Sequence, residues 1–91
     1  MHSEANGHSI GAALIRERAT THGDYSANAS TAQAIKQALR NAPGWHDLSP
    51  RQRESLDLIA TKMSRIVSGN PNEPDHWNDI SGYAELAGKG E

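Results

Sequence analysis

The segment from Ser49 to Gly69 constrains the fold most strongly, because it carries both a start signal and a stop signal for one long helix. Ser49 suits the N-cap, Pro50 suits the first helical position, and Gln52 follows at the spacing of a capping box. Gly69 suits the C-terminal cap. Between these ends the apolar residues recur at helical spacing and form one continuous face: Leu56, Ile59, Ala60, Met63, Ile66 and Val67. We therefore predict a helix that ends near residue 68.

The same reasoning predicts three further helices and no strand. A short helix over about residues 10–21 follows Ser9, a suitable cap, and Gly23 suits its end. Asp24 can cap the next helix, over about residues 25–41, and a last helix covers about residues 75–87. The expected fold is an all-α antiparallel bundle of four helices, the first of them short. Residues 9–87 form its single domain, with residues 1–8 as a disordered start and residues 88–91 as a frayed tail.

Helical wheels predict which side chains face the core. The inner stripe of the second helix contains Asn28, Thr31, Ala32, Ile35, Ala38 and Leu39. The fourth helix is expected to bury Trp77, Ile80, Tyr83, Ala84 and Ala87. Pro43 and Gly44 break the helical pattern, and we expect Trp45 to begin a loop that folds back onto the core.

Such a core is thin for a domain of 91 residues. Hydrophobic residues make up 35% of the chain, aromatic residues 4%, and there is no Phe. Small chains with little apolar surface to bury often depend on a partner subunit. We therefore expect a homo-oligomer.

Charge and composition exclude several classes of function. The net charge of −2 does not favour binding to nucleic acid, which requires clustered Lys and Arg. The absence of cysteine excludes disulfides, thiol nucleophiles and zinc–thiolate sites. No apolar run is long enough for a membrane span or a signal-peptide core. We expect a cytoplasmic protein.

The most informative stretch for function runs from Asp75 to Leu86. On a helix, Asp75, Asp79 and Tyr83 fall on one stripe. Asp79 lies at the edge of the apolar arc, so its carboxylate needs a cation or hydrogen-bond donors. If the third and fourth helices pair antiparallel, Lys62 or Arg65 could meet Asp79.

Two interpretations of this charge set remain open. In the structural one, a half-buried salt bridge from Asp79 to Lys62 or Arg65 fixes the register of the helix pair. In the functional one, carboxylates hold Mg²⁺ while Lys62 and Arg65 meet phosphate oxygens. The expected metal ligands are Glu54, Asp75 and Asp79. Asp57 points further round its helix and is expected to be a solvated surface acid.

The histidines and tyrosines complete the candidate site. His76 could be a general base, a ligand or a partly buried ring. His22 with Asp24 and Tyr25 forms a second polar group at a helix break, where functional residues often lie. The structural alternative there is capping by Asp24 and packing of Tyr25 against the core. The candidate ligand-binding residues are Lys62, Arg65, His76, Tyr83, His22 and Tyr25.

Three ordered blocks carry a resemblance to a family of small proteins of tailed phages and prophages: Arg16-Glu17-Arg18 followed by His22-Gly23-Asp24-Tyr25; Lys62-Met63-Ser64-Arg65-Ile66; and Asp75-His76-Trp77-Asn78-Asp79-Ile80-Ser81-Gly82-Tyr83-Ala84. The resemblance spans about residues 16–86. The combination of blocks in this order is more specific than any single block.

A more distant similarity is to the all-α, MazG-like nucleoside triphosphate pyrophosphatases. In that superfamily, Glu-x-x-Glu and Glu-x-x-Asp motifs on two helices bind Mg²⁺, which holds the triphosphate for attack by water. Asp79 matches the final acid of the second motif, but His76 stands where a Glu is expected. Glu54 and Asp57 could pass for the first motif, although the wheel separates them. The resemblance implies the fold more firmly than it implies hydrolysis.

These observations support two hypotheses of different class. The first is a phage-derived nucleotide-handling protein that binds or hydrolyses a (d)NTP or a related phosphate compound with Mg²⁺. The second is a non-catalytic helical module that binds a host or phage protein. A variant of the first is a sponge that binds a signalling nucleotide without turnover. Whether the chain is an enzyme is left open by the residues.

Overall fold

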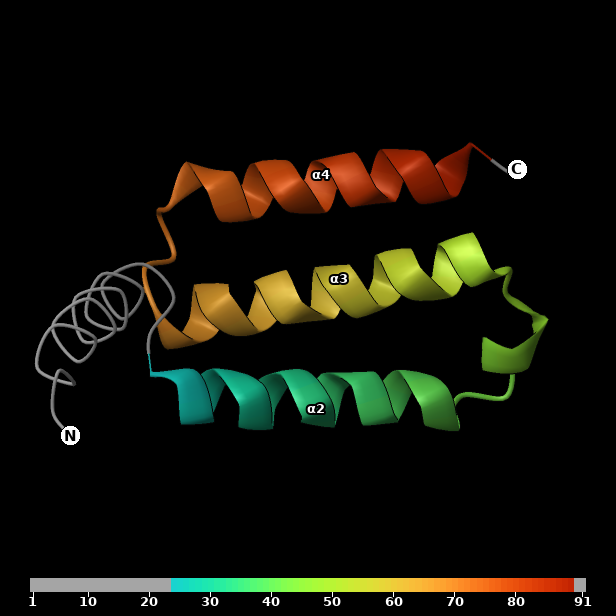
Figure 1. Ribbon diagram of the computed structural model, residues 1–91, viewed down its shortest axis with the longest axis horizontal. Coiled ribbons are helices and arrows are strands. Elements are labelled where there is room, and N and C mark those ends of the chain that lie inside the picture. The colour runs from blue at the N-terminus through green and yellow to red at the C-terminus, as the bar shows by residue number, and fades with distance from the viewer. Residues whose placement is uncertain (1–23, 90–91) are drawn as a thin grey trace, which may run out of the picture.

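The computed structural model describes residues 24–89, which form three α-helices and one 3-10 turn (Figure 1). These are α2 (Tyr25–Asn41), η1 (Trp45–Asp47), α3 (Pro50–Ser68) and α4 (Pro74–Gly88). Helix α3 lies between α2 and α4, packs against both, and runs antiparallel to each. No strand occurs within this range, which confirms the all-α prediction for it. The predicted first helix, with Ser9, His22 and Gly23, lies outside the described residues.

Helix α2 begins where its capping residue dictates. The Asp24 carboxylate accepts a hydrogen bond from the Ala27 N–H at 3.0 Å and so satisfies one of the free donors of the first turn. Arg40 stands in the last turn, where a cation opposes the negative end of the helix dipole. The predicted bounds of this helix are confirmed.

Helix α3 confirms its predicted signals at both ends. The Gln52 N–H donates to Ser49 Oγ at 3.1 Å, and the Ser49 N–H donates to Gln52 Oε1 at 3.0 Å, which completes the capping box. At the other end the Gly69 N–H donates to the Arg65 carbonyl at 2.9 Å. Local sequence therefore determines the length of the central helix.

Helix α4 begins one residue earlier than predicted, and its cap is Glu73. Glu73 occupies the N-cap, and its side chain accepts from the Asp75 N–H at 3.4 Å. Pro74 takes the first helical position, for which its fixed φ is suited, so the cap falls on the residue before it. Asp75 stands in the first turn, where an acid opposes the positive end of the helix dipole.

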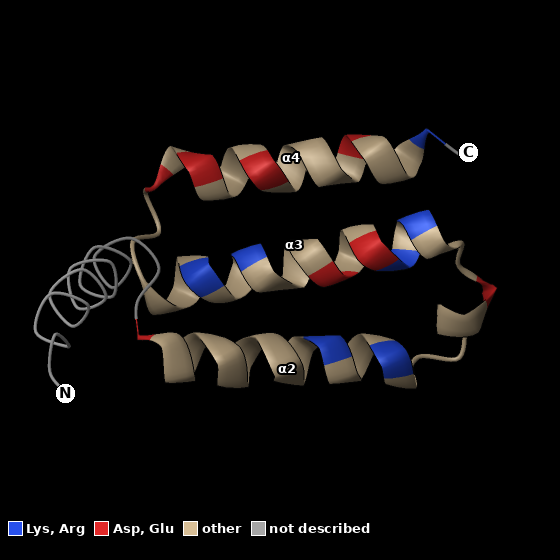
Figure 2. Ribbon diagram, in the orientation of Figure 1, with Lys and Arg blue, Asp and Glu red and all other residues tan. Residues whose placement is uncertain are grey.

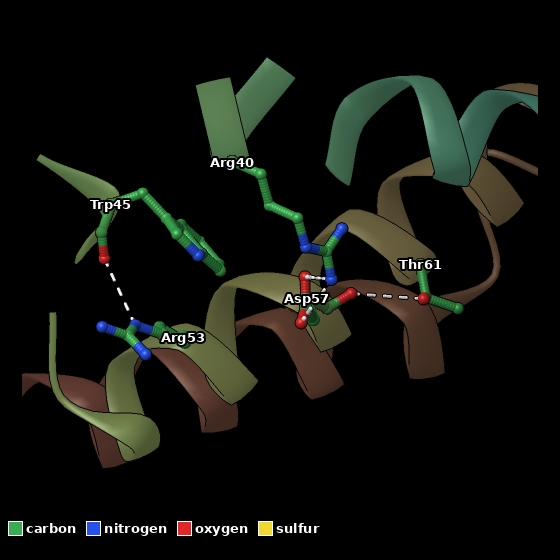
Figure 3. Close-up of polar contacts among 5 residues, drawn as sticks. All are labelled: Arg40, Trp45, Arg53, Asp57 and Thr61. Atoms are coloured by element: carbon green, nitrogen blue, oxygen red, sulfur yellow. Dashed lines mark hydrogen bonds and ion pairs between the residues drawn. The ribbon is translucent and has the colours of Figure 1, made fainter. Parts of the chain in front are cut away.

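The η1 turn anchors the connection from α2 to α3 (Figure 3). Trp45 is buried, as expected for a loop that folds back onto the core, and Arg53 Nε donates to its carbonyl at 3.2 Å. The Arg40 guanidinium carbon lies 5.8 Å from the centre of the Trp45 ring. Arg40 also pairs with Asp57 at 3.3 Å. The expectation that Asp57 is a solvated acid is therefore wrong, because its position on α3 faces α2.

The seams between the helices are built from small and polar side chains. The buried residues are Asn28, Ala32, Trp45, Ser55, Ala60, Ser64 and His76. The buried Ser64 hydroxyl is hydrogen-bonded within its own helix, since it donates to the Thr61 carbonyl at 2.7 Å. Small residues let helix backbones approach closely, but each buries little apolar area.

Few of the apolar residues that were expected to form the core are fully buried. On α3, only Ala60 of the predicted apolar face is buried, while Met63 and Val67 are exposed. On α4, Trp77 and Ala84 are exposed, and Ala38 of α2 is exposed as well. The predictions of burial for these residues are wrong. On α3 the reason is that the helix faces its neighbours with other sides.

Candidate functional site

Parts of all three sequence blocks lie at one end of the helical layer. The start of α2, the last turns of α3 and the first turns of α4 lie together at this end (Figure 1). Acidic positions near the start of α4 stand beside basic positions near the end of α3 (Figure 2). We call this region, defined by Asp24, Lys62, Arg65, Asp75 and Asp79, the charged end.

Lys62 and Asp79 form the ion pair at the centre of the charged end. Lys62 Nζ lies 2.8 Å from Asp79 Oδ2, with the Lys62 side chain 14% exposed and that of Asp79 44% exposed. The hydrogen bond from Lys62 lowers the pKa of the Asp79 carboxyl, and the charges of Lys62, His76 and Arg65 add to this effect against the opposing effect of burial. The predicted antiparallel pairing of these helices and the contact with Lys62 are both present.

Arg65 lies one turn beyond Lys62 and is half-buried. Its side chain makes no hydrogen bond or ion pair with any residue in the described range. Its charge nevertheless reaches Asp79, since it contributes to the lowered pKa of that carboxyl. A guanidinium carries five N–H donors in a planar fork suited to oxyanions. Arg65 therefore has hydrogen-bonding capacity left for a ligand.

His76, only 1% exposed, is the largest fully buried side chain among the described residues. It stands on α4 one turn before Ile80, on the side of the helix that faces the layer. A ligand arriving from solvent does not reach a ring at this depth. The position favours the interpretation of His76 as a buried structural ring over a general base.

The three predicted metal ligands are not brought together. Among the described residues, no group of three or more His, Asp or Glu side chains could hold a metal ion. Asp79 pairs with Lys62, whereas Glu54 lies eight residues earlier on α3, a separation of about 12 Å along the axis at 1.5 Å per residue. The arrangement does not fit a site in which Glu54, Asp75 and Asp79 share one Mg²⁺.

Glu54 and Tyr83 instead line a pocket of about 430 Å³ between α3 and α4. Its other lining residues are Arg51, Ser55, Leu58, Leu86 and Lys89. Arg51 spans its end, where its Nη1 donates to the Leu86 carbonyl at 3.2 Å. None of these five was predicted as a site residue. Once Lys62 is paired with Asp79, an antiparallel register predicts these residues. Residues before Lys62 on α3 then lie opposite residues after Asp79 on α4.

The second polar group is only partly described. Asp24 caps α2, as the structural alternative predicted. Tyr25 is 83% exposed, so the expected packing of its ring against the core is wrong. Tyr25 is the first residue of α2. His22 lies outside the described range.

In the part of the chain that the structure describes, no helix combines the length and the apolar character needed to cross a membrane.

The fold defines a small helical domain in which three separate sequence blocks place residues at one end of the layer. The chain belongs to the family described as a domain of unknown function, DUF6378, which matches residues 9–91. Comparison with curated proteins gave no match. Comparison with solved structures also gave none.

Proposed function

We propose that this chain binds a phosphate-bearing small molecule of the nucleotide class at the charged end. The observation that best supports this is Arg65, a half-buried guanidinium with no hydrogen-bond or ion-pair partner among the described residues. Covering part of such a group without an acceptor for its N–H donors is unfavourable. A phosphate would supply paired acceptor oxygens for the fork of Arg65.

Lys62 would be the second cation of the site. It already pairs with Asp79 at 2.8 Å, so its ammonium is held in place before a ligand arrives. A lysine has three donors and can share them between Asp79 and a phosphate oxygen. Asp79 would therefore act as the residue that positions Lys62, and its lowered pKa keeps it charged for that role.

Binding is a better-supported proposal than hydrolysis. The carboxylates that would hold Mg²⁺ in a MazG-like pyrophosphohydrolase are not grouped among the described residues. We still predict that Mg²⁺ binds together with the ligand, held by the phosphate oxygens and by fewer protein ligands.

Calorimetry with deoxynucleoside triphosphates and monophosphates, with and without Mg²⁺, tests the proposal. We expect Arg65→Gln to weaken binding by about tenfold or more, the equivalent of one charge-assisted hydrogen bond. Lys89→Gln is the matched control, because it removes a cation at the far end of α4. No heat of binding with any of these ligands, or equal loss in both variants, would contradict the proposal.

A parallel assay for pyrophosphate separates binding from turnover. Release of pyrophosphate from a triphosphate would identify a hydrolase. Tight binding without release would support a sponge for a signalling nucleotide. Both outcomes require the charged end, so Arg65→Gln should weaken either one.

A helical module that binds another protein is the second candidate, because large apolar side chains are exposed. Trp77 of α4 is 53% exposed, although its Nε1 donates to the Pro71 carbonyl at 2.7 Å and holds the ring in place. Fixed, exposed aromatic rings are common anchors of protein interfaces. Affinity capture with Trp77→Ala as the control would detect a stoichiometric partner that depends on this ring.

The resemblance to phage proteins carries a proposal about where this chain acts. We propose an origin in a phage or prophage and a site of action in the cytoplasm of a bacterial host. Localisation of a tagged chain in bacterial cells tests the second part. The expected homo-oligomer is a separate proposal and is argued below.

A further inference from the structure

We propose that this chain forms a two-fold symmetric homodimer through one side of its helical layer. We call this the apolar side and define it by Leu56, Ile59, Met63, Ile66 and Val67 of α3, with Ile35 of α2 and Ile80 of α4. This inference is independent of the proposed ligand site.

The contacts of α3 fix which way the apolar side points. At about 100° per residue, the α3 residues that meet α4, such as Leu58 and Lys62, fall on one flank of the helix. Those that meet α2 and η1, such as Arg53 and Asp57, fall on the opposite flank. Leu56, Met63 and their apolar neighbours occupy the arc between these flanks. They therefore face out of the layer and not toward α2 or α4.

The exposed fractions agree with this placement. Val67 is 72% exposed and Met63 is 43% exposed. Leu56, Ile59 and Ile66 are half-buried. A row of five large apolar side chains on one central helix is unusual on a free surface.

The flanking helices extend the same surface. Given the sides on which α2 and α4 contact α3, the wheel places Ile35 and Ile80 on the same side of the layer as the α3 row. No Lys, Arg, Asp or Glu of these three helices falls on that side. The charged residues lie in the seams, on the outer edges or on the opposite side, as the Arg40–Asp57 and Lys62–Asp79 pairs illustrate. An uncharged surface of this kind matches an equally apolar partner.

The size of the apolar side selects a second copy as that partner. With 19 residues, α3 is about 28 Å long at 1.5 Å per residue. Three neighbouring helices at spacings of about 8–10 Å make the side roughly 25 Å wide, so its footprint is roughly 700 Å². A stable dimer buries about 800 Å² on each subunit. The footprint is therefore of the size that one half of a dimer interface requires.

A segment of the same chain would cover much less of this surface. A helix of the length predicted for residues 10–21 would be about 18 Å long and about 10 Å wide, which is roughly 180 Å². Its apolar residues are few: Ile10, Ala13 and Leu14 on its predicted face. A second copy presents the identical apolar side, and a two-fold axis lets each copy cover the other.

Light scattering coupled to size exclusion, with the full chain over a wide range of concentrations, tests the dimer. We expect twice the protomer mass for the wild type. Val67→Glu and Met63→Glu should each shift the mass toward one protomer. Gln33→Glu is the matched control, because it adds the same charge at an exposed position of α2 away from the apolar side. It should leave the mass of the dimer unchanged.

Thermal unfolding followed by circular dichroism tests the dimer on the wild type alone, in case a variant does not fold. A dimer unfolds with a Tm that rises with protein concentration, whereas the Tm of a monomer does not. A wild-type chain with the mass of one protomer and a concentration-independent Tm would overturn the proposal. So would a Val67→Glu variant that remains dimeric. In the first case the apolar side would be assigned to residues 10–21 or to a different protein.

Nucleotide calorimetry and mass measurement report on different residues. Arg65→Gln should remove ligand binding and keep the dimer. Val67→Glu should remove the dimer. Failure of the dimer proposal is therefore distinguishable from failure of the ligand proposal.

Discussion

Lys62 Nζ and Asp79 Oδ2 lie 2.8 Å apart and join the last turns of α3 to the second turn of α4. The two ends of this pair differ in their surroundings. The Lys62 side chain is largely covered, whereas that of Asp79 is nearly half exposed. Removing one partner therefore has different consequences from removing the other, because a covered charge that loses its counter-ion is the costlier one to leave behind.

The first prediction concerns Asp79→Asn. The amide is almost the same size as the carboxylate but leaves the covered ammonium of Lys62 without a counter-charge. We expect the Tm to fall by a few degrees, and only modestly, because Asp79 itself is partly in water. Asp75→Asn is the control, since Asp75 is exposed and stands one turn earlier on the same helix. Equal Tm values for the two variants would show that the ion pair does not stabilise the fold.

The same variant separates the two interpretations of the charged end. If the pair only sets the helix register, Asp79→Asn should lower the Tm and change nucleotide binding no more than a general loss of stability would. If the pair positions Lys62 for a phosphate, binding should weaken at a temperature where the variant is fully folded. Calorimetry at that temperature, with helicity checked by circular dichroism, distinguishes the outcomes.

Stability at acid pH should depend on the same carboxyl. The pKa of Asp79 is lowered from 3.8 in the folded chain, chiefly by the hydrogen bond from Lys62. A lowered pKa means that the stabilising contribution is complete above the unfolded value and is lost as the pH falls through the folded value. The Tm difference between wild type and Asp79→Asn should therefore be constant near neutral pH and shrink below about pH 4. A difference that grows on acidification would contradict this.

The sequence predicted the helices well, because their ends are set locally. The cap at Asp24 and the capping box at Ser49 are decided by the side chain and a few neighbouring N–H groups. The contact of Lys62 with Asp79 was also predictable, since an acid at the edge of an apolar arc needs a cation nearby. These are short-range or pairwise relationships that a single sequence contains.

Burial was predicted poorly, for the opposite reason. A helical wheel shows that a helix has an apolar side but not which neighbour covers it. On α3 and α4 the seams are filled by Ser64, Ala60 and His76, while Met63 and Trp77 remain exposed. The grouping of Glu54, Asp75 and Asp79 failed similarly, because the distance between residues on two helices depends on their register. Register is fixed by tertiary packing and not by the spacing within either helix.

The capping box of α3 gives a prediction with a well-defined size. Ser49→Ala removes the Oγ that accepts from the Gln52 N–H. Of the two hydrogen bonds in the capping box, only the one from the N–H of residue 49 to Gln52 Oε1 can remain. We expect the free energy of unfolding to fall by about 1 kcal/mol, within the range measured for N-cap serines. Ser81→Ala is the control, because Ser81 is exposed in the middle of α4, where alanine is the better helix former. Urea unfolding of both variants measures the difference, and an unchanged midpoint for Ser49→Ala would exclude a stabilising role for the box.

Trp45 gives the last prediction, and the largest in magnitude. It is the only large apolar side chain among the described residues that is buried, and its carbonyl is bound by Arg53. Trp45→Ala should lower the free energy of unfolding by about 3–5 kcal/mol, the usual cost of removing a large aromatic side chain from a core. The total free energy of unfolding of a small domain is only about 5–15 kcal/mol, so much of this variant should unfold on mild heating.

Trp45→Phe keeps an aromatic ring and should be affected less. The smaller ring still offers Arg40 a weaker cation–π partner than Trp45 does at 5.8 Å. Trp77→Phe is the control, since that ring is exposed, and it leaves Trp45 as the single tryptophan whose fluorescence follows unfolding. A Trp45→Ala variant as stable as Trp77→Phe would show that the η1 turn does not anchor the layer.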